Sequence, residues 1–274
     1  MLLCLDIGNS QIFGGLFVSE DLKIQFRKTS QIQASSDELG VFFRSVLREN
    51  QVEPDEIDEV VVCCVVPELL YSVRACSQKY FDVDPLILRP GVKTGLKILY
   101  KDPKEVGADR IADAVGAISK FPRTNLIVAD FGTATTICAI NKRKEFLGGS
   151  ILPGVRLAME ALENRTAQLP SVEIKAVKNV IGKSTVESIQ SGLYWSNVGM
   201  IKEFVNRITQ EQFNDEPPLV IGTGGFANLF SRERIFDEVV SDLILIGLKE
   251  MIAKRISDWE FIDFQFFILA RRSD

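Results

Sequence analysis

The feature that most constrains this chain is a short pattern that occurs twice. In each copy an apolar run ends in an aspartate, a glycine follows two residues later, and a second apolar run follows after a few polar residues. The first copy contains Asp6 and Gly8, and the second contains Asp130 and Gly132, 124 positions further on. Apolar runs this short predict buried strands joined by a tight turn. The repetition predicts two similar α/β lobes.

The rest of the chain alternates between strand and helix patterns. Such alternation predicts an α/β fold with mixed sheets flanked by helices. A polar break near residues 119–125 predicts a boundary between two domains, 1–119 and 120–274. Helices are expected over 37–49, 69–80, 110–120, 155–163, 185–210 and 242–256, and further strands over 59–66, 135–140 and 219–223.

Composition limits the chemistry that the chain can perform. It contains no histidine, which removes the usual general base, the usual zinc ligand and the nucleophile systems that depend on histidine. Acid–base chemistry therefore depends on Asp, Glu, Lys, Tyr or Cys. The formal net charge is −5 and no basic block occurs, which argues against nucleic acid as a partner.

The five cysteines predict free thiols. Their number is odd, no CxxC spacing occurs, and all but Cys76 lie in apolar runs, so we expect buried thiols and the reducing cytoplasm. Cys76 lies in a more polar stretch, where the thiol is expected to be more accessible. No apolar run reaches 18 residues and the first is broken at Asp6, so neither a membrane span nor a signal peptide is expected.

The two glycine turns have two interpretations. Their backbone N–H groups can cradle phosphate oxygens, and the adjacent aspartates can hold a cation that neutralises phosphate charge. Alternatively, each is an ordinary hairpin whose aspartate satisfies backbone donors. The glycine-rich stretch 147–154 fits either a ligand wall or a plain turn, and in the stretch 221–225 the backbone N–H groups are candidates for binding a nucleotide's sugar or phosphates. No P-loop or dinucleotide fingerprint is present.

Asp109 stands at the start of a predicted helix, within the segment 106–110. An aspartate there is most often a helix cap. Its neighbours favour a functional role, because Gly107 allows close backbone approach and Arg110 offers a planar donor fork for carboxylate or phosphate. Asp109 is therefore a candidate general base.

Taken together and in this order, the motifs resemble those of the type III pantothenate kinase family. The resemblance spans about Leu2 to Ile252 and implies the duplicated ribonuclease H-like lobes of the acetate and sugar kinase, Hsc70 and actin superfamily. The segments that carry it are Asp6-Ile-Gly-Asn-Ser10, Gly107-Ala-Asp-Arg110, Asp130-Phe-Gly-Thr-Ala-Thr135, Gly148-Gly-Ser-Ile-Leu-Pro-Gly154 and Thr223-Gly-Gly225.

The resemblance implies ATP-dependent phosphorylation of pantothenate to 4′-phosphopantothenate, the first step of coenzyme A biosynthesis. It implies that Asp109 is the proton acceptor, that Asp130 holds potassium or ammonium, and that the protein is a homodimer. Magnesium is expected with ATP, held through water by Asp6. The implied ATP contacts are Asp6, Ile7, Gly8, Asn9, Ser10, Gln11, Ile12, Phe13 and Thr133, and the implied pantothenate contacts are Tyr100, Gly107, Ala108, Asp109, Arg110 and Thr185.

Two features depart from the family pattern. Ser10 stands where the family usually has threonine, and serine retains the hydroxyl group. The aromatic segment 258–274 matches no family element and fits a last strand, a dimer surface or a partner contact. Two other functions stay open: an accessory factor for transcription, and a related kinase or phosphohydrolase with a different substrate. Pantothenate-dependent release of ADP would separate all three.

Overall fold

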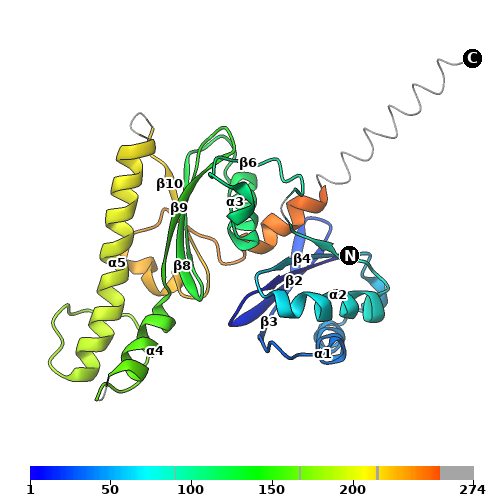
Figure 1. Cartoon of the computed structure of the whole chain (residues 1–274), viewed down its shortest axis with the longest axis horizontal. Helices are drawn as coiled ribbons and strands as arrows, with labels where there is room; N and C mark the ends of the chain where they lie inside the picture. Colours follow the sequence, from blue (N-terminus) through cyan, green and yellow to red (C-terminus); the bar gives the residue numbers. More distant parts are fainter. Residues whose placement is uncertain (90, 167, 214–215, 254–274) are drawn as a thin grey trace, which may run out of the picture. The chain divides into compact units, whose positions relative to one another are not determined.

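The structure is a computed structural model that describes residues 1–89, 91–166, 168–213 and 216–253, and it divides into two compact units (Figure 1). Of the described residues, the first unit contains those of Met1–Leu96 and Lys104–Ser119 and residues 244–253, and the second contains those of Lys97–Pro103 and Lys120–Leu243. The expected domains, 1–119 and 120–274, were continuous in sequence. Residues 97–103 belong instead to the second unit, and residues 244–253 belong to the first. The reason is that each segment packs with elements distant from it in the sequence. The aromatic segment 258–274 lies outside the described residues.

The first unit is built on a five-stranded sheet with the order β3-β2-β1-β4-β5. The central strand β1 is antiparallel to β2 and parallel to β4. Burial of β1 and β4 on both faces accounts for their continuous apolar runs. The strands are β1 (Leu2–Ile7), β2 (Gln11–Val18), β3 (Asp21–Thr29), β4 (Glu59–Cys64) and β5 (Leu86–Ile87).

Helices α1 (Ser36–Glu49) and α2 (Pro67–Phe81) cover one face of this sheet, where Leu3, Leu5 and Ile7 enter the core. A capping box between Ser35 and Glu38 begins α1, because each residue satisfies a backbone N–H of the other. Pro67 begins α2 at its first position, so the preceding strand ends at Cys64 rather than at the predicted residue 66. The short 3₁₀ helix η1 (Pro54–Glu56) precedes β4.

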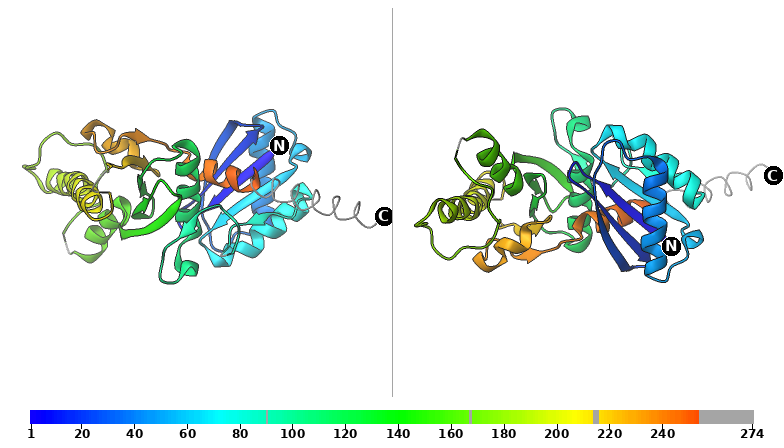
Figure 2. Two further views of the ribbon diagram at one scale, coloured as in Figure 1. Left: turned by 90° about the horizontal axis from the view of Figure 1, so that it is seen from above. Right: turned by 90° about the horizontal axis from the view of Figure 1, so that it is seen from below.

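Two further helices belong to the first unit: α3 (Ala108–Lys120), and a helix over residues 243–253 that packs against both the sheet and α3. The second of these lies across the strands of this unit in both views of Figure 2. A Cβ added to Gly15 would lie 2.6 Å from the Leu245 side chain, and one added to Gly247 would lie 1.9 Å from the Ala112 carbonyl oxygen. Glycine is therefore required at 247, where the neighbour is backbone, whereas a larger residue at 15 would make the Leu245 side chain move.

The second unit is built on a six-stranded sheet with the order β11-β10-β7-β8-β9-β6. Its core contains Phe131, Tyr194 and Phe230. The centre of the Phe230 ring lies 5.0 Å from that of Phe131 and 5.4 Å from that of Tyr194. The strands are β6 (Lys97–Ile98), β7 (Leu126–Phe131), β8 (Ala134–Ile140), β9 (Glu145–Pro153), β10 (Leu219–Thr223) and β11 (Glu238–Val239). The helices are α4 (Val155–Arg165) and α5 (Thr185–Gln212), with the 3₁₀ helix η3 (Ala227–Glu233); the 3₁₀ helix η2 (Pro103–Glu105) spans the point where the chain passes from the second unit to the first.

The strand order confirms the predicted duplication. Strand β7 is antiparallel to β8 and parallel to β10, as β1 is to β2 and β4. The expected fold class, α/β with mixed sheets flanked by helices, is therefore confirmed. One detail differs: Gly148 and Gly149 were expected in a turn but lie inside β9, where a Cβ on Gly149 would be 2.1 Å from the Ile137 carbonyl oxygen.

All five cysteines are free thiols in the described part of the chain. Cys76 was expected to be accessible, but it is buried because its face of α2 packs into the core of the first unit. Cys64 is the half-buried one, and its thiol donates to the Val66 carbonyl at 3.1 Å. Within the described ranges, no helix is long and apolar enough to cross a membrane.

Candidate functional site

The first predicted phosphate turn joins β1 to β2 through residues 8–11. The Gly8 N–H donates to the Gln11 carbonyl at 3.0 Å and closes the turn. Asn9, Ser10 and Gln11 are exposed. An exposed turn of this kind presents backbone and side-chain donors to an anion.

A cation lies beside this turn on β3. The Arg27 guanidinium stacks over the Phe13 ring at 3.9 Å, and its Nη1 donates to the Gln11 side-chain oxygen at 3.5 Å. Stacking on an aromatic face fixes the orientation of a guanidinium. The turn therefore has a positive charge within its own sheet.

Asp6, at the end of β1, lies next to a buried thiol on β4. The two strands run parallel, with Asp6 in register with Cys63, and the side chains of the two residues are hydrogen-bonded. Cys63 is fully buried. Burial raises the pKa of the Cys63 thiol well above its usual value, and the nearby carboxylates of Asp6, Asp109 and Asp113 raise it further. Asp6 and two carboxylates of α3 therefore act on the charge of one neutral thiol.

Helix α3 supplies two of these carboxylates from a single face. Asp109 and Asp113 are separated by four residues, which places them one helical turn apart. The Asp109 Oδ1 accepts the backbone N–H of Arg110 at 2.8 Å. Arg110 and Asp113 are each only 5% exposed. The helix thus holds Asp109 at its partly exposed end and Asp113 in the interior.

The preceding glycine allows Asp109 to adopt this position. A Cβ on Gly107 would lie 2.4 Å from the Asp109 Oδ1, too close for any real contact. The Gly107 carbonyl accepts the Ile111 N–H at 3.2 Å and so belongs to the first helical turn. Gly107 is therefore required for the position of the carboxylate rather than for the formation of the helix.

The second predicted turn joins β7 to β8 in the other unit, and glycines surround its aspartate. A Cβ on Gly224 would lie 2.2 Å from the Asp130 Oδ1, and Gly224 has a φ of +85°, which other residues adopt at a cost. The Gly154 N–H donates to the Thr133 carbonyl at 3.2 Å. Asp130 and Thr133 are thus held at the end of β7 by backbone from two distant segments.

Tyr100 and Thr185 both belong to the second unit. The Tyr100 ring packs 6.4 Å from that of Phe146, and its edge lies 3.7 Å from the position that a Cβ on Gly148 would occupy. Gly148 has a φ of +130°, which explains the choice of glycine there. Thr185 is the exposed first residue of α5.

The expected ions are magnesium and a monovalent cation, and both would need oxygen ligands. Among the residues that the structure describes, no group of three or more cysteine or carboxylate side chains is arranged to hold a metal ion. A divalent ion would therefore need ligands from water and from the substrate, which is the usual arrangement for magnesium with a nucleotide. Asp130 offers a single carboxylate beside the Gly224 backbone.

The decisive comparison is with protein families. The model of the family described as type III pantothenate kinase matches residues 2–207. A type III pantothenate kinase of Legionella pneumophila (strain Corby) is 52% identical over 249 residues, which cover 91% of this chain and 97% of the relative. This chain belongs to the type III pantothenate kinase family. The resemblance predicted from the sequence motifs is thereby confirmed.

Solved structures agree on the fold of this type III pantothenate kinase. A protein of Campylobacter jejuni, assigned to the Baf family of transcriptional activators, superimposes with a TM-score of 0.57 at 19% identity, covering 93% of this chain and 99% of that one. The activator of 2-hydroxyisocaproyl-CoA dehydratase from Clostridium difficile, with bound ADPNP, gives 0.52 at 14% identity and covers 94% and 97%. At these identities the likeness concerns the fold alone.

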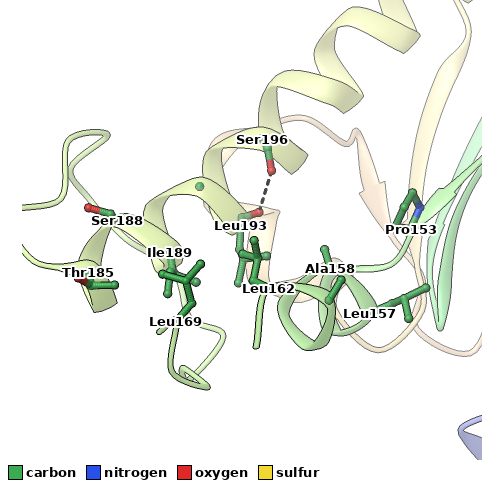
Figure 3. Close-up of a pocket in the computed structure, with 12 residues that line it drawn as sticks. Pro153, Leu157, Ala158, Leu162, Leu169, Thr185, Ser188, Ile189, Leu193 and Ser196 are labelled. Carbon is green, nitrogen blue, oxygen red and sulfur yellow. Dashed lines mark hydrogen bonds between the residues drawn. The ribbon is translucent and has the colours of Figure 1, made fainter. Parts of the chain in front are cut away.

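This type III pantothenate kinase also has an apolar groove of about 960 Å³ between α4 and α5. Figure 3 shows Leu157, Ala158 and Leu162 of α4 opposite Ile189 and Leu193 of α5. Thr185 contributes a hydroxyl at one end of the groove, as Ser188 and Ser196 do further along α5. The sequence motifs did not predict this groove, because its residues are apolar positions spread over two helices.

Asp113 was not among the residues predicted for the site from the sequence. The signal was a carboxylate four residues after Asp109 on an otherwise apolar helix. An acidic residue on the buried face of a helix needs a compensating environment and is therefore worth noting.

Proposed function

We propose that this chain transfers the γ-phosphoryl group of ATP to the primary hydroxyl of pantothenate and forms 4′-phosphopantothenate, the first step of coenzyme A biosynthesis. The observation that carries the proposal is that one unit holds both Asp6, beside an exposed glycine turn, and Asp109, and that both carboxylates act on the charge of one buried thiol. A phosphate-binding turn and a carboxylate base in one unit are the two parts that phosphoryl transfer to an alcohol requires.

The turn is proposed to bind the phosphates of ATP. Residues Asp6 to Phe13 supply the backbone and side-chain donors, and Thr133 adds a contact from the second unit. Donors that are oriented before the substrate binds stabilise transferred charge without reorganisation during the reaction. Magnesium, when bound to the phosphates, neutralises the charge that develops during transfer. Asp6 is proposed to orient a water of its coordination shell.

Asp109 is proposed to accept the proton of the attacking hydroxyl. Phosphoryl transfer passes through a loose transition state, in which the nucleophile needs its proton removed only late. An ordinary carboxylate is sufficient for that task, which suits a chain without histidine. Pantothenate is proposed to contact Tyr100, Gly107, Ala108, Arg110 and Thr185, with the Arg110 guanidinium pairing either with the substrate carboxylate or with the transferred phosphoryl group.

Asp130 is proposed to bind potassium or ammonium. Glycine at 224 keeps a side chain away from this carboxylate, because a Cβ there would lie 2.2 Å from Oδ1. A monovalent cation there would offset the negative charge of bound ATP. The protein is further proposed to act as a homodimer in the cytoplasm.

The test is ADP release by the purified protein with ATP and magnesium, with and without pantothenate, in potassium and in sodium buffer. Release that requires pantothenate and is stronger in potassium supports both the acceptor and the cation. Asp109→Asn should lower kcat by at least about 100-fold while ATP still binds. Asp21→Asn, which changes an exposed carboxylate on β3, serves as the matched control. Wild-type kcat in Asp109→Asn would exclude it as the base.

A further inference from the structure

Ser30 connects the end of β3 to the turn at residues 8–11. It follows β3 directly, and the β2–β3 register pairs Thr29 with Gln11. Two hydrogen bonds run from this one residue to the turn. The Ser30 backbone N–H donates to the Ser10 carbonyl at 3.0 Å, and the Ser30 hydroxyl donates to the Gly8 carbonyl at 2.5 Å.

These two bonds determine the direction of the turn's amide groups. Every peptide bond in the described chain is trans, so within each peptide plane the C=O and the following N–H point in opposite directions. Because the Gly8 carbonyl points toward Ser30, the Asn9 N–H points away from it. The same argument applies to the Ser10 carbonyl and the Gln11 N–H. Ser30 thus fixes the donor direction of two of the three peptides in an exposed turn, those between Gly8 and Asn9 and between Ser10 and Gln11.

We propose that Ser30 is a positioning residue that holds the phosphate-binding turn of this kinase in its donor-presenting conformation. This inference rests on the proposed binding of ATP phosphates by residues 8–11. Ser30 does not take part in the chemistry itself, because its hydroxyl donates its hydrogen bond to the Gly8 carbonyl. Ser30 restricts the turn before the nucleotide binds. The turn therefore loses less conformational entropy on binding.

The test compares Ser30→Ala with Ser30→Thr. The alanine variant keeps the backbone bond to Ser10 but leaves the Gly8 carbonyl without its hydroxyl donor, which should lower kcat/KM for ATP by about 10-fold. The KM for pantothenate should stay unchanged. Threonine retains the hydroxyl and should restore the value for ATP. Thr29→Ala, a change of the exposed hydroxyl residue directly before Ser30, is the matched control.

Failure of this inference can be distinguished from failure of the proposed function. Ser10→Ala alters the turn itself and should weaken ATP use if the turn binds phosphate. An effect of Ser10→Ala without one of Ser30→Ala would overturn the positioning role alone. An equal loss of ATP and pantothenate parameters in Ser30→Ala, together with a lowered melting temperature and no rescue by threonine, would show a merely structural residue. No effect of Ser10→Ala on ATP would remove the premise.

Discussion

Gly107→Ala would displace the proposed base without disturbing the helix that holds it. The new Cβ would lie 2.4 Å from the Asp109 Oδ1, whereas real contacts of this kind do not fall below 3.0 Å. The carboxylate must therefore retreat by at least the difference, 0.6 Å. A displacement approaching 1 Å at a reacting group costs up to about 100-fold in rate, so we expect kcat to fall by roughly 10- to 100-fold.

The thermal stability of Gly107→Ala should not fall together with its kcat. Gly107 does not have a positive φ, and replacing glycine by alanine at such a position stabilises by roughly 0.4–1 kcal/mol through the unfolded state. Pantothenate-dependent ADP release would give kcat, and thermal unfolding would give stability. The control is Gly199→Ala, at a helical glycine of α5 where a Cβ would meet no atom within 4 Å. A wild-type kcat in Gly107→Ala would refute the reasoning, because it would mean that the position of this carboxylate does not matter.

Two further predictions concern the second unit. Gly224→Ala forces an alanine into a φ of +85° against the Asp130 carboxylate, so the free energy of unfolding should fall by roughly 1–3 kcal/mol and the response to potassium should disappear. Urea unfolding and ADP release in potassium and sodium test this, and an unaltered potassium response would contradict the cation site. Hydrogen bonds from Asn141 and Lys97, with the nearby Arg143, lower the pKa of Glu145 from 4.5 to about 2. Because this pKa is lowered by folding, Glu145 stabilises the protein above pH 4.5 and that contribution is lost as the pH falls toward 2. Unfolding measured across this range should depend less on pH in Glu145→Gln than in the wild type, and parallel curves for the two proteins would exclude the effect.

The sequence predicted the duplicated strands and most helices because their signals are local. The runs that became β1 and β7 are short, apolar and bounded by turn residues, and α5 follows a cap at Ser184. Strand β3 was missed although its sequence alternates, with Ile24 and Phe26 buried between exposed residues. Its charged side chains made the segment resemble a polar connection.

The contacts that define the site were less predictable from sequence. The motifs identified Asp6 and Asp109 individually, but the pairing of β1 with β4 was needed to place Cys63 beside Asp6. The glycines at 148 and 149 resemble a turn in the sequence, yet they serve close packing within a strand. Non-local strand pairing and backbone approach leave no local pattern, and the link from Ser30 to Gly8 is of the same kind.

The return of the chain to the first unit affects the order in which the protein can be assembled during synthesis. Leu245 and Gly247 pack against Gly15 and Ala112, residues translated more than a hundred positions earlier. A nascent chain is produced from its N-terminus, so the first sheet leaves the ribosome long before the helix at 243–253 that packs on it. The second unit, complete by Leu243, is fully synthesised earlier. The unit that begins the chain is therefore the last to be completed.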